Sequence, residues 1–151
     1  MGSAKFTFKR NEAIVGILEG GEYLSSYAMG RIKSNPQGSD FGMIQGSIIL
    51  MALSIELCLK SIIEDFSGSY SKTHSIKVLF SELEETLQAT IREEYSSEAK
   101  KNNWLDFSDL LNEISSIFVE WRYATMDGGV LNLQMDSWDY FAKLLTKNFN
   151  N

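Results

Sequence analysis

The sequence predicts a single all-α domain, folded as an up-down helical bundle of four to five helices. Only one of the 151 residues is a proline, the residue that a helix interior tolerates least. Hydrophobic residues recur in five segments at the three- and four-residue spacing of one helix face. A chain of this length, 44% hydrophobic and 23% charged, can bury a core of its own. We therefore treat residues 1–151 as one domain.

The first helix is expected over residues 11–33. Asn11 followed by Glu12 suits a helix start. The pair Gly20-Gly21 weakens the helix, because each glycine costs about 1 kcal/mol relative to alanine. Residues 34–40 hold a proline and a glycine and are expected to form a loop. We expect residues 1–10 to lack order or to include a cloning remnant, of which Met-Gly-Ser is typical.

The second helix is expected over residues 42–66 and is the most apolar of the five. Its hydrophobic residues cover nearly every face, which is typical of a helix at the centre of a bundle or in an oligomer interface. Glu56 and Lys60 are four residues apart, in the order that favours an ion pair on a helix. Because they share a face with apolar residues, we expect this pair to be partly buried.

Three further helices complete the bundle. They are expected over residues 74–92 with Thr73 as N-cap, over residues 107–123, and over residues 137–149 with Asp136 as N-cap. The polar stretch 93–103 is either a helical extension or a mobile loop. Alternation of apolar and polar residues at Leu131, Leu133 and Met135 predicts a short extended segment before the last helix.

Composition excludes several classes of function. The formal net charge of −6 disfavours a non-specific nucleic-acid binder, which normally carries a basic patch. One cysteine, Cys58, cannot form an internal disulfide, and its apolar surroundings predict a buried side chain. One cysteine and one histidine cannot fill a tetrahedral zinc site, so we expect no metal and no cofactor.

Nothing in the sequence suggests a secreted or membrane protein. The longest apolar run is interrupted by Ser54 and Glu56 before it reaches the ~18 residues that span a bilayer. The first residues lack the apolar stretch of a signal peptide. We expect a cytoplasmic protein that does not bind membranes.

Three motifs occur in a familiar order. The second helix carries an A-x-x-x-E-x-x-L-K pattern over residues 52–60. It is followed by Lys-Thr-His-Ser-Ile at residues 72–76, close to a K-T-H-D-L pattern, and by Trp-Arg-Tyr-Ala at residues 121–124. Together these motifs, spread over residues 42–124, resemble those of the HEPN superfamily of small helical proteins.

The resemblance implies a prokaryotic homodimer. HEPN proteins are often partners of a nucleotidyltransferase-like protein in toxin–antitoxin or phage-defence pairs. Many members cleave RNA with an R-x4–6-H motif from each of two protomers. Here Arg122 stands at the right place, but Asp127, Gly128 and Gly129 occupy the positions of the histidine, and no histidine follows. The resemblance thus predicts a degenerate motif and a non-catalytic, homodimeric module that binds a protein partner or a nucleotide or RNA ligand.

Two residues are candidates for catalysis. His74 is the only histidine, the residue type used most often to transfer protons; the alternative is that it fixes the loop before the third helix. Arg122 could stabilise phosphate charge; the alternative is an ion pair with a buried carboxylate such as Glu56. The ligand-binding candidates are Glu56, Lys60, Lys72, Arg122 and Tyr123, of which Tyr123 would stack on a base or close the core.

Two other functions remain open. A divergent, metal-independent ribonuclease would draw Arg122 and His74 into one cleft across a dimer. A structural or immunity-type protein would bind its partner through an apolar groove, which suits the broad apolar surface of the second helix. We expect the second or fourth helix to contribute to a two-fold dimer interface.

Overall fold

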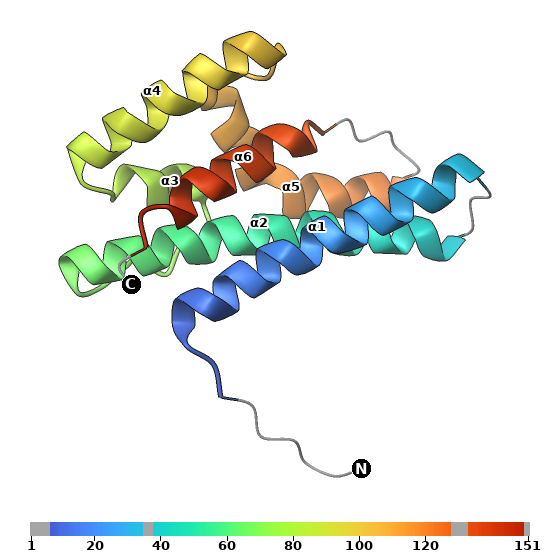
Figure 1. The fold of residues 1–151 in the computed structure, drawn as a ribbon, viewed down its shortest axis with the longest axis horizontal. Coiled ribbons are helices and arrows are strands. Elements are labelled where there is room, and N and C mark those ends of the chain that lie inside the picture. Colours follow the sequence, from blue (N-terminus) through green and yellow to red (C-terminus); the bar gives the residue numbers. More distant parts are fainter. Residues whose placement is uncertain (1–6, 35–37, 128–132, 150–151) are drawn as a thin grey trace.

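A computed structural model describes residues 7–34, 38–127 and 133–149, apart from the side chains of residues 34, 118, 119 and 121–127. The described residues form six helices and no strand: α1 (Arg10–Ser34), α2 (Gly38–Ser67), α3 (Ile76–Ser81), α4 (Glu85–Asn102), α5 (Phe107–Asp127) and α6 (Met135–Thr146). The prediction of an all-α helical bundle is confirmed (Figure 1). With six helices among the described residues, the bundle has one more than the largest number expected.

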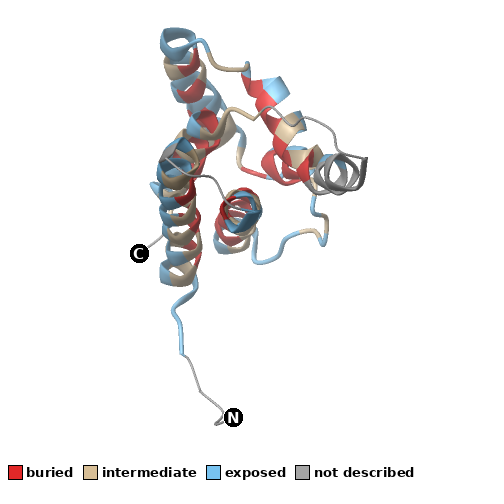
Figure 2. Cartoon of the chain, turned by 90° about the vertical axis from the view of Figure 1, so that its right-hand side faces the viewer, coloured by how far each residue is buried: buried red, intermediate tan, exposed pale blue. Residues whose placement is uncertain are grey.

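α2 is the central helix, as its apolar sequence predicted. α1 runs antiparallel along it on one side, α6 crosses it, and α3 and α5 pack near it (Figure 1). Buried residues lie on the sides of the helices that face the interior (Figure 2). The largest fully buried side chains are Trp138, Tyr95, Phe80 and Phe141, so aromatic rings from α3, α4 and α6 fill much of the core.

By length and composition, α2 could also cross a membrane. However, 67% of its most apolar window is buried inside the protein, as in the core helix of a bundle. The lone cysteine confirms this setting, because Cys58 on α2 is fully buried. Burial raises the pKa of its thiol to about 12 and so disfavours the reactive thiolate.

The expected third helix is in fact two helices, and this corrects the sequence prediction. α3 ends at Ser81, and the amide of Glu82 donates to the carbonyl of Leu79 in a tight turn. α4 then starts with Glu84 as N-cap, whose carboxylate accepts from the amide of Leu87 at 3.1 Å. The N-cap of α3 is Ser75 and not Thr73, because the Ser75 side chain accepts from the amide of Val78.

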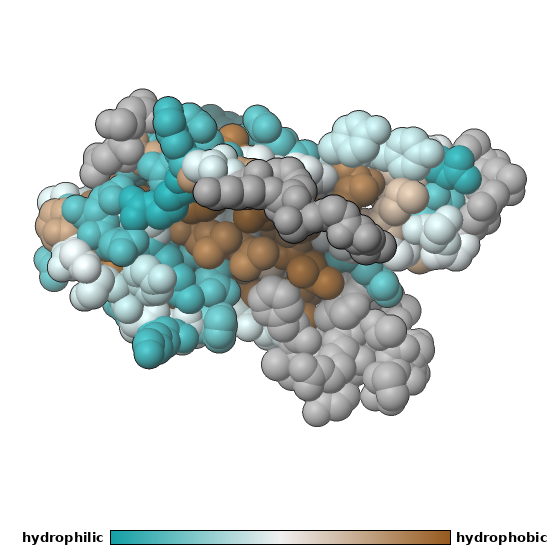
Figure 3. All heavy atoms as spheres, turned by 90° about the horizontal axis from the view of Figure 1, so that it is seen from below, coloured by the Kyte–Doolittle hydropathy of each residue, from teal (hydrophilic) through white to brown (hydrophobic). Residues whose placement is uncertain are grey.

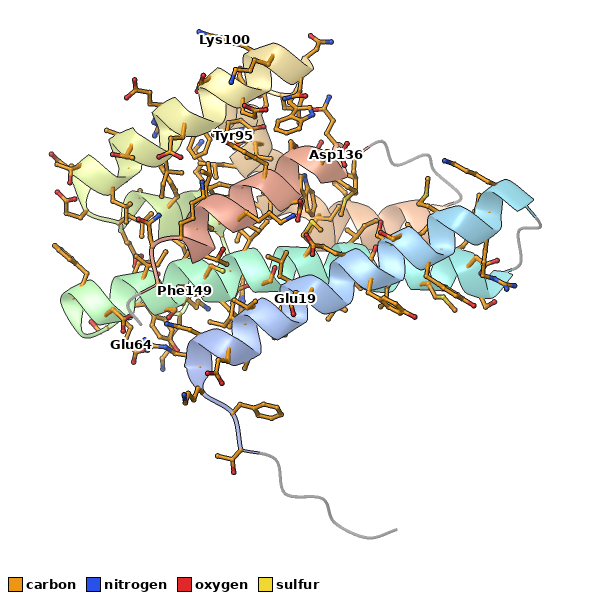
Figure 4. The ribbon with its side chains drawn as sticks, viewed as in Figure 1. Glu19, Glu64, Tyr95, Lys100, Asp136 and Phe149 are labelled. Carbon is orange, nitrogen blue, oxygen red and sulfur yellow. The ribbon has the colours of Figure 1, made fainter. Side chains whose placement is uncertain are left out.

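The polar stretch 93–103 is a helical extension, since α4 continues to Asn102. It ends at Asn103, which adopts a left-handed conformation with φ of 52°, a conformation that asparagine tolerates better than most residues. Tyr95 lies between α4 and α6 (Figure 4), and its hydroxyl donates to the carbonyl of Leu105 at 3.1 Å. These contacts join the end of α4 to the start of α5.

The last helix also differs at its start. α6 begins at Met135 with Gln134 as its N-cap, and not after Asp136. The side chain of Gln134 is used elsewhere, where its oxygen accepts from the amide of Leu105 at 2.7 Å. Of the expected extended segment, Leu131 lies outside the described residues, and Met135 is already helical.

Candidate functional site

Three of the predicted site residues meet on one side of α2. Glu56 and Lys60 occupy successive turns of the helix, and the Lys60 ammonium donates to Oε1 of Glu56 at 2.7 Å. The same carboxylate oxygen lies 3.0 Å from Nδ1 of His74, on the connection between α2 and α3. The fold therefore brings together the two motifs that lie at residues 52–60 and 72–76.

Burial differs sharply across this cluster. The side chain of Glu56 is 8% exposed and that of Lys60 is 13% exposed, whereas that of His74 is 80% exposed. The prediction of a partly buried Glu56–Lys60 pair is thus confirmed. The Lys60 ammonium also lies 5.4 Å from the centre of the Tyr70 ring, a favourable cation–π distance. Through its contact with His74, the buried Glu56 joins the α2–α3 connection to the core helix α2.

The chemistry open to this cluster is limited. A carboxylate that contacts one nitrogen of an imidazole fixes the orientation of the ring, and the exposure of His74 leaves its edge open to solvent. A catalytic site would also need a nucleophile or a cation aimed at a substrate, whereas the Lys60 ammonium is paired with Glu56. Lys72 is exposed on the same connection. Among the described contacts, the cluster serves to hold the α2–α3 connection against α2.

The two remaining candidates lie on α5. Arg122 and Tyr123 fall in its last turns, but their side chains lie outside the described residues, so the Glu56–Arg122 ion pair remains a prediction. The C-terminal end of α5 lies toward the end of the molecule where α1 and α2 join, whereas the α2–α3 connection lies toward the opposite end (Figure 1).

A second polar cluster joins α1 to α6 and was not predicted. The Lys143 ammonium lies 2.8 Å from Oε1 of Glu22 and 2.6 Å from Oδ2 of Asp139. The two carboxylates line a polar cavity of about 330 Å³, whose other walls are Ser25, Ser26, Met51, Met135 and Asp136. Asp136 lies at the N-terminal end of α6 (Figure 4).

The two carboxyl groups of this cluster differ in proton affinity. Burial and the neighbouring Glu22 carboxylate raise the pKa of Asp139 to about 6, against the opposing effect of Lys143. A hydrogen bond from Asp139, followed by contact with Lys143, lowers the pKa of Glu22. Oδ1 of Asp139 is buried without a hydrogen-bond donor among the described residues. Asp139 therefore holds its proton to a higher pH than Glu22 does.

Sequence reasoning could find only part of this cluster. Asp139 and Lys143 are four residues apart on a helix, a recognisable pairing. Glu22 comes from the other end of the chain, and only the packing of α1 against α6 brings it near. The cluster is no metal site, because no group of three or more His, Cys, Asp or Glu among the described residues could hold a metal ion.

Comparison with known proteins identifies one family. The family model described as HEPN domain matches residues 40–139, from the start of α2 into α6, and leaves out α1. No curated protein and no solved structure matches the chain.

Proposed function

The chain belongs to the HEPN domain family, and from this membership we propose that it is a non-catalytic HEPN module that acts as a homodimer and binds a protein partner. Family members of this size are often partners of a nucleotidyltransferase-like protein in toxin–antitoxin or phage-defence pairs, and we propose a partner of that kind. The proposed location is the cytoplasm.

One observation carries the non-catalytic part of the proposal. His74, the only histidine of the chain, lies on the α2–α3 connection and contacts the buried carboxylate of Glu56 on α2. This connection lies toward the opposite end of the molecule from the last turns of α5 (Figure 1). In ribonucleases of this family, four to six residues separate the arginine from the histidine that follows it. Arg122 has no such histidine, and within one protomer His74 is poorly placed to replace it.

The choice of a protein over RNA as partner follows from the surface. The chain carries 20 acidic against 14 basic residues, and a strong RNA binder would need a concentration of positive charge. Large hydrophobic side chains are instead exposed on α1 and just before it, on α2, on the α2–α3 connection and on α3; they include Phe8, Tyr23, Phe41, Ile49, Phe66, Tyr70 and Val78. Exposed apolar groups of this kind are typical of surfaces that bind proteins.

A divergent ribonuclease remains the second candidate, because a two-fold axis could bring His74 of one protomer toward Arg122 of the other. It predicts that both side chains contribute to one activity. In that case substitution of either residue would abolish RNA cleavage while leaving the protein folded.

The proposal is tested first by binding. We would measure the mass of the purified protein by light scattering and its affinity for labelled single-stranded RNA by fluorescence anisotropy. The expected results are twice the chain mass of 17.1 kDa and weak RNA binding that falls steeply with salt. Tight RNA binding at physiological salt would contradict the protein-partner proposal, and a monomer at high concentration would contradict the homodimer.

A further inference from the structure

One side of α1 is left open by the described part of the fold. α1 packs against α2 and touches α6, and its other side carries a stripe of residues at alternating spacings of three and four. The stripe consists of Ala13, Gly16, Gly20, Tyr23 and Tyr27. Tyr23 is 69% exposed and Tyr27 is 45% exposed. A repeat of about 3.5 residues is the spacing with which one helix packs along another.

The N-terminal half of the stripe is hollow. An apolar hollow of about 680 Å³ is lined chiefly by Phe8, Ala13, Gly16, Ile17, Gly20 and Leu50. A Cβ atom added at Gly16 or Gly20 would meet nothing within 4 Å, so the hollow exists because these residues lack side chains. Hydrophobic atoms are exposed in the middle of the face seen from below (Figure 3), and α1 and α2 are the lowest helices in Figure 1.

The C-terminal half of the stripe is raised. The rings of Tyr23 and Tyr27 stack with their centroids 6.4 Å apart. Tyr23 and Tyr27 lie three and seven residues after Gly20, and Gly16 and Ala13 lie four and seven residues before it. A two-fold interface presents the same surface on both subunits, so hollow and raised parts must lie symmetrically about the axis. Gly20 is the point about which this stripe has that symmetry.

We propose that α1 pairs with α1 of a second copy, antiparallel, about a two-fold axis near Gly20. In this arrangement the partner's Tyr23 and the partner's Tyr27 fill the hollow beside Gly16 and Ala13, and the contact is repeated on the other side of the axis. This inference rests on the proposed homodimer and assigns its interface. Leu50 of α2 lines the same hollow, so the interface includes the second helix as well.

The helix dipoles favour the antiparallel orientation. Antiparallel pairing opposes the dipoles of the two α1 helices. Parallel pairing would align these dipoles and would place tyrosine on tyrosine and glycine on glycine.

The available surface is also of a suitable size. A stable interface buries about 800 Å² on each partner. At their observed exposure, the two tyrosines of each copy would contribute on the order of 200–300 Å² of this. Phe8, which is 72% exposed beside the hollow, and Ile49 of α2, which is 41% exposed, add further apolar surface. The match to the HEPN domain family begins at residue 40 and does not include α1.

Crosslinking tests the axis directly. In the Gly20→Cys variant, the two new thiols would approach across the axis closely enough for a disulfide, which requires Cα atoms about 4.4–6.8 Å apart. The matched control is Gly42→Cys on α2, where an added Cβ also meets nothing within 4 Å. We expect a covalent dimer from Gly20→Cys under mild oxidation, and none from Gly42→Cys. Because Cys58 is fully buried, it should give no background.

A substitution that blocks the contact completes the test. A Cβ atom at position 20 meets nothing within 4 Å, so Gly20→Arg should keep the thermal midpoint of the wild type while shifting the mass from dimer to monomer. Gly42→Arg should stay dimeric. A wild-type dimer that neither Gly20 variant affects would overturn this interface and leave the homodimer intact. A monomeric wild type would overturn both, and would leave the hollow to a segment of another protein.

Discussion

Oε1 of Glu56 lies within hydrogen-bond distance of both Lys60 and His74, at 2.7 and 3.0 Å. The first contact lies within α2 and the second crosses to the α2–α3 connection. A single buried oxygen therefore links the motif of the core helix to the motif of the loop. This link gives His74 a structural role in the fold, whatever the chain binds.

The two contacts of Glu56 should differ in strength. Glu56→Ala leaves Lys60 without its carboxylate at a site where the lysine side chain is only 13% exposed, and loss of one partner of a buried pair costs about 3–5 kcal/mol. His74→Ala removes a contact of an imidazole that is 80% exposed and should cost less than about 1 kcal/mol. Urea unfolding of both variants measures the difference, and equal losses would contradict it.

The Glu22–Asp139 pair predicts a pH dependence. Because the pKa of Asp139 is raised from 3.8 to about 6 in the folded protein, the folded state binds this proton more tightly than the unfolded state does. Its contribution to stability is therefore lost as the pH rises through 6. Asp139→Asn mimics the protonated form, so it should be more stable than the wild type at pH 7. This advantage in the free energy of unfolding should be larger at pH 7 than at pH 4 by on the order of 2 kcal/mol.

The control for this prediction is Asp136→Asn, which changes an exposed carboxylate on the same helix. It should keep the pH profile of the wild type. Denaturant unfolding at several pH values between 4 and 7 gives the curves. Parallel curves for the wild type and Asp139→Asn would show that the pKa of Asp139 is not raised in the folded protein.

The single thiol should be protected. With the pKa of Cys58 raised to about 12 by burial, almost no thiolate is present at pH 8, and the side chain is fully buried. A thiol reagent should therefore label the native protein only when the fold around α2 opens transiently. In denaturant it should label one site per chain. Rapid labelling of the native protein would show that α2 is accessible.

A side-chain hydrogen bond of Tyr95 helps to join α4 to the start of α5. Tyr95 is fully buried, and its hydroxyl donates to the carbonyl of Leu105. Tyr95→Phe keeps the ring contacts and removes this bond, so it should cost about 1 kcal/mol. The thermal midpoint measures this loss, and an unchanged midpoint would mean that solvent replaces the bond.

The sequence predicts the helices better than their ends. α1, α2 and α5 follow from apolar periodicity, which in α1 outweighs the pair Gly20-Gly21. The break between α3 and α4 was missed because Leu79, Leu83 and Leu87 keep helical spacing across it. Leu83 remains 5% exposed in the turn, so the apolar pattern serves the core without a continuous helix. Similarly, Gln134 caps α6 although Asp136 is the more typical capping residue.

The site was predictable only where its residues are close in sequence. Glu56 and Lys60 lie four apart on one helix, and their burial followed from the apolar residues around them. The contact of His74 with Glu56 depends on how the α2–α3 connection folds back, and the contact of Glu22 with Asp139 depends on how α1 packs against α6. Periodicity along one helix carries no information about either.

We propose above that this HEPN module does not cleave RNA. The most direct measurement is a time course with labelled single-stranded RNA and an excess of protein, run beside Arg122→Ala and His74→Ala. We predict that the wild type degrades RNA no faster than either variant does. Cleavage by the wild type that both folded variants lose would contradict the claim and establish a ribonuclease site shared by Arg122 and His74.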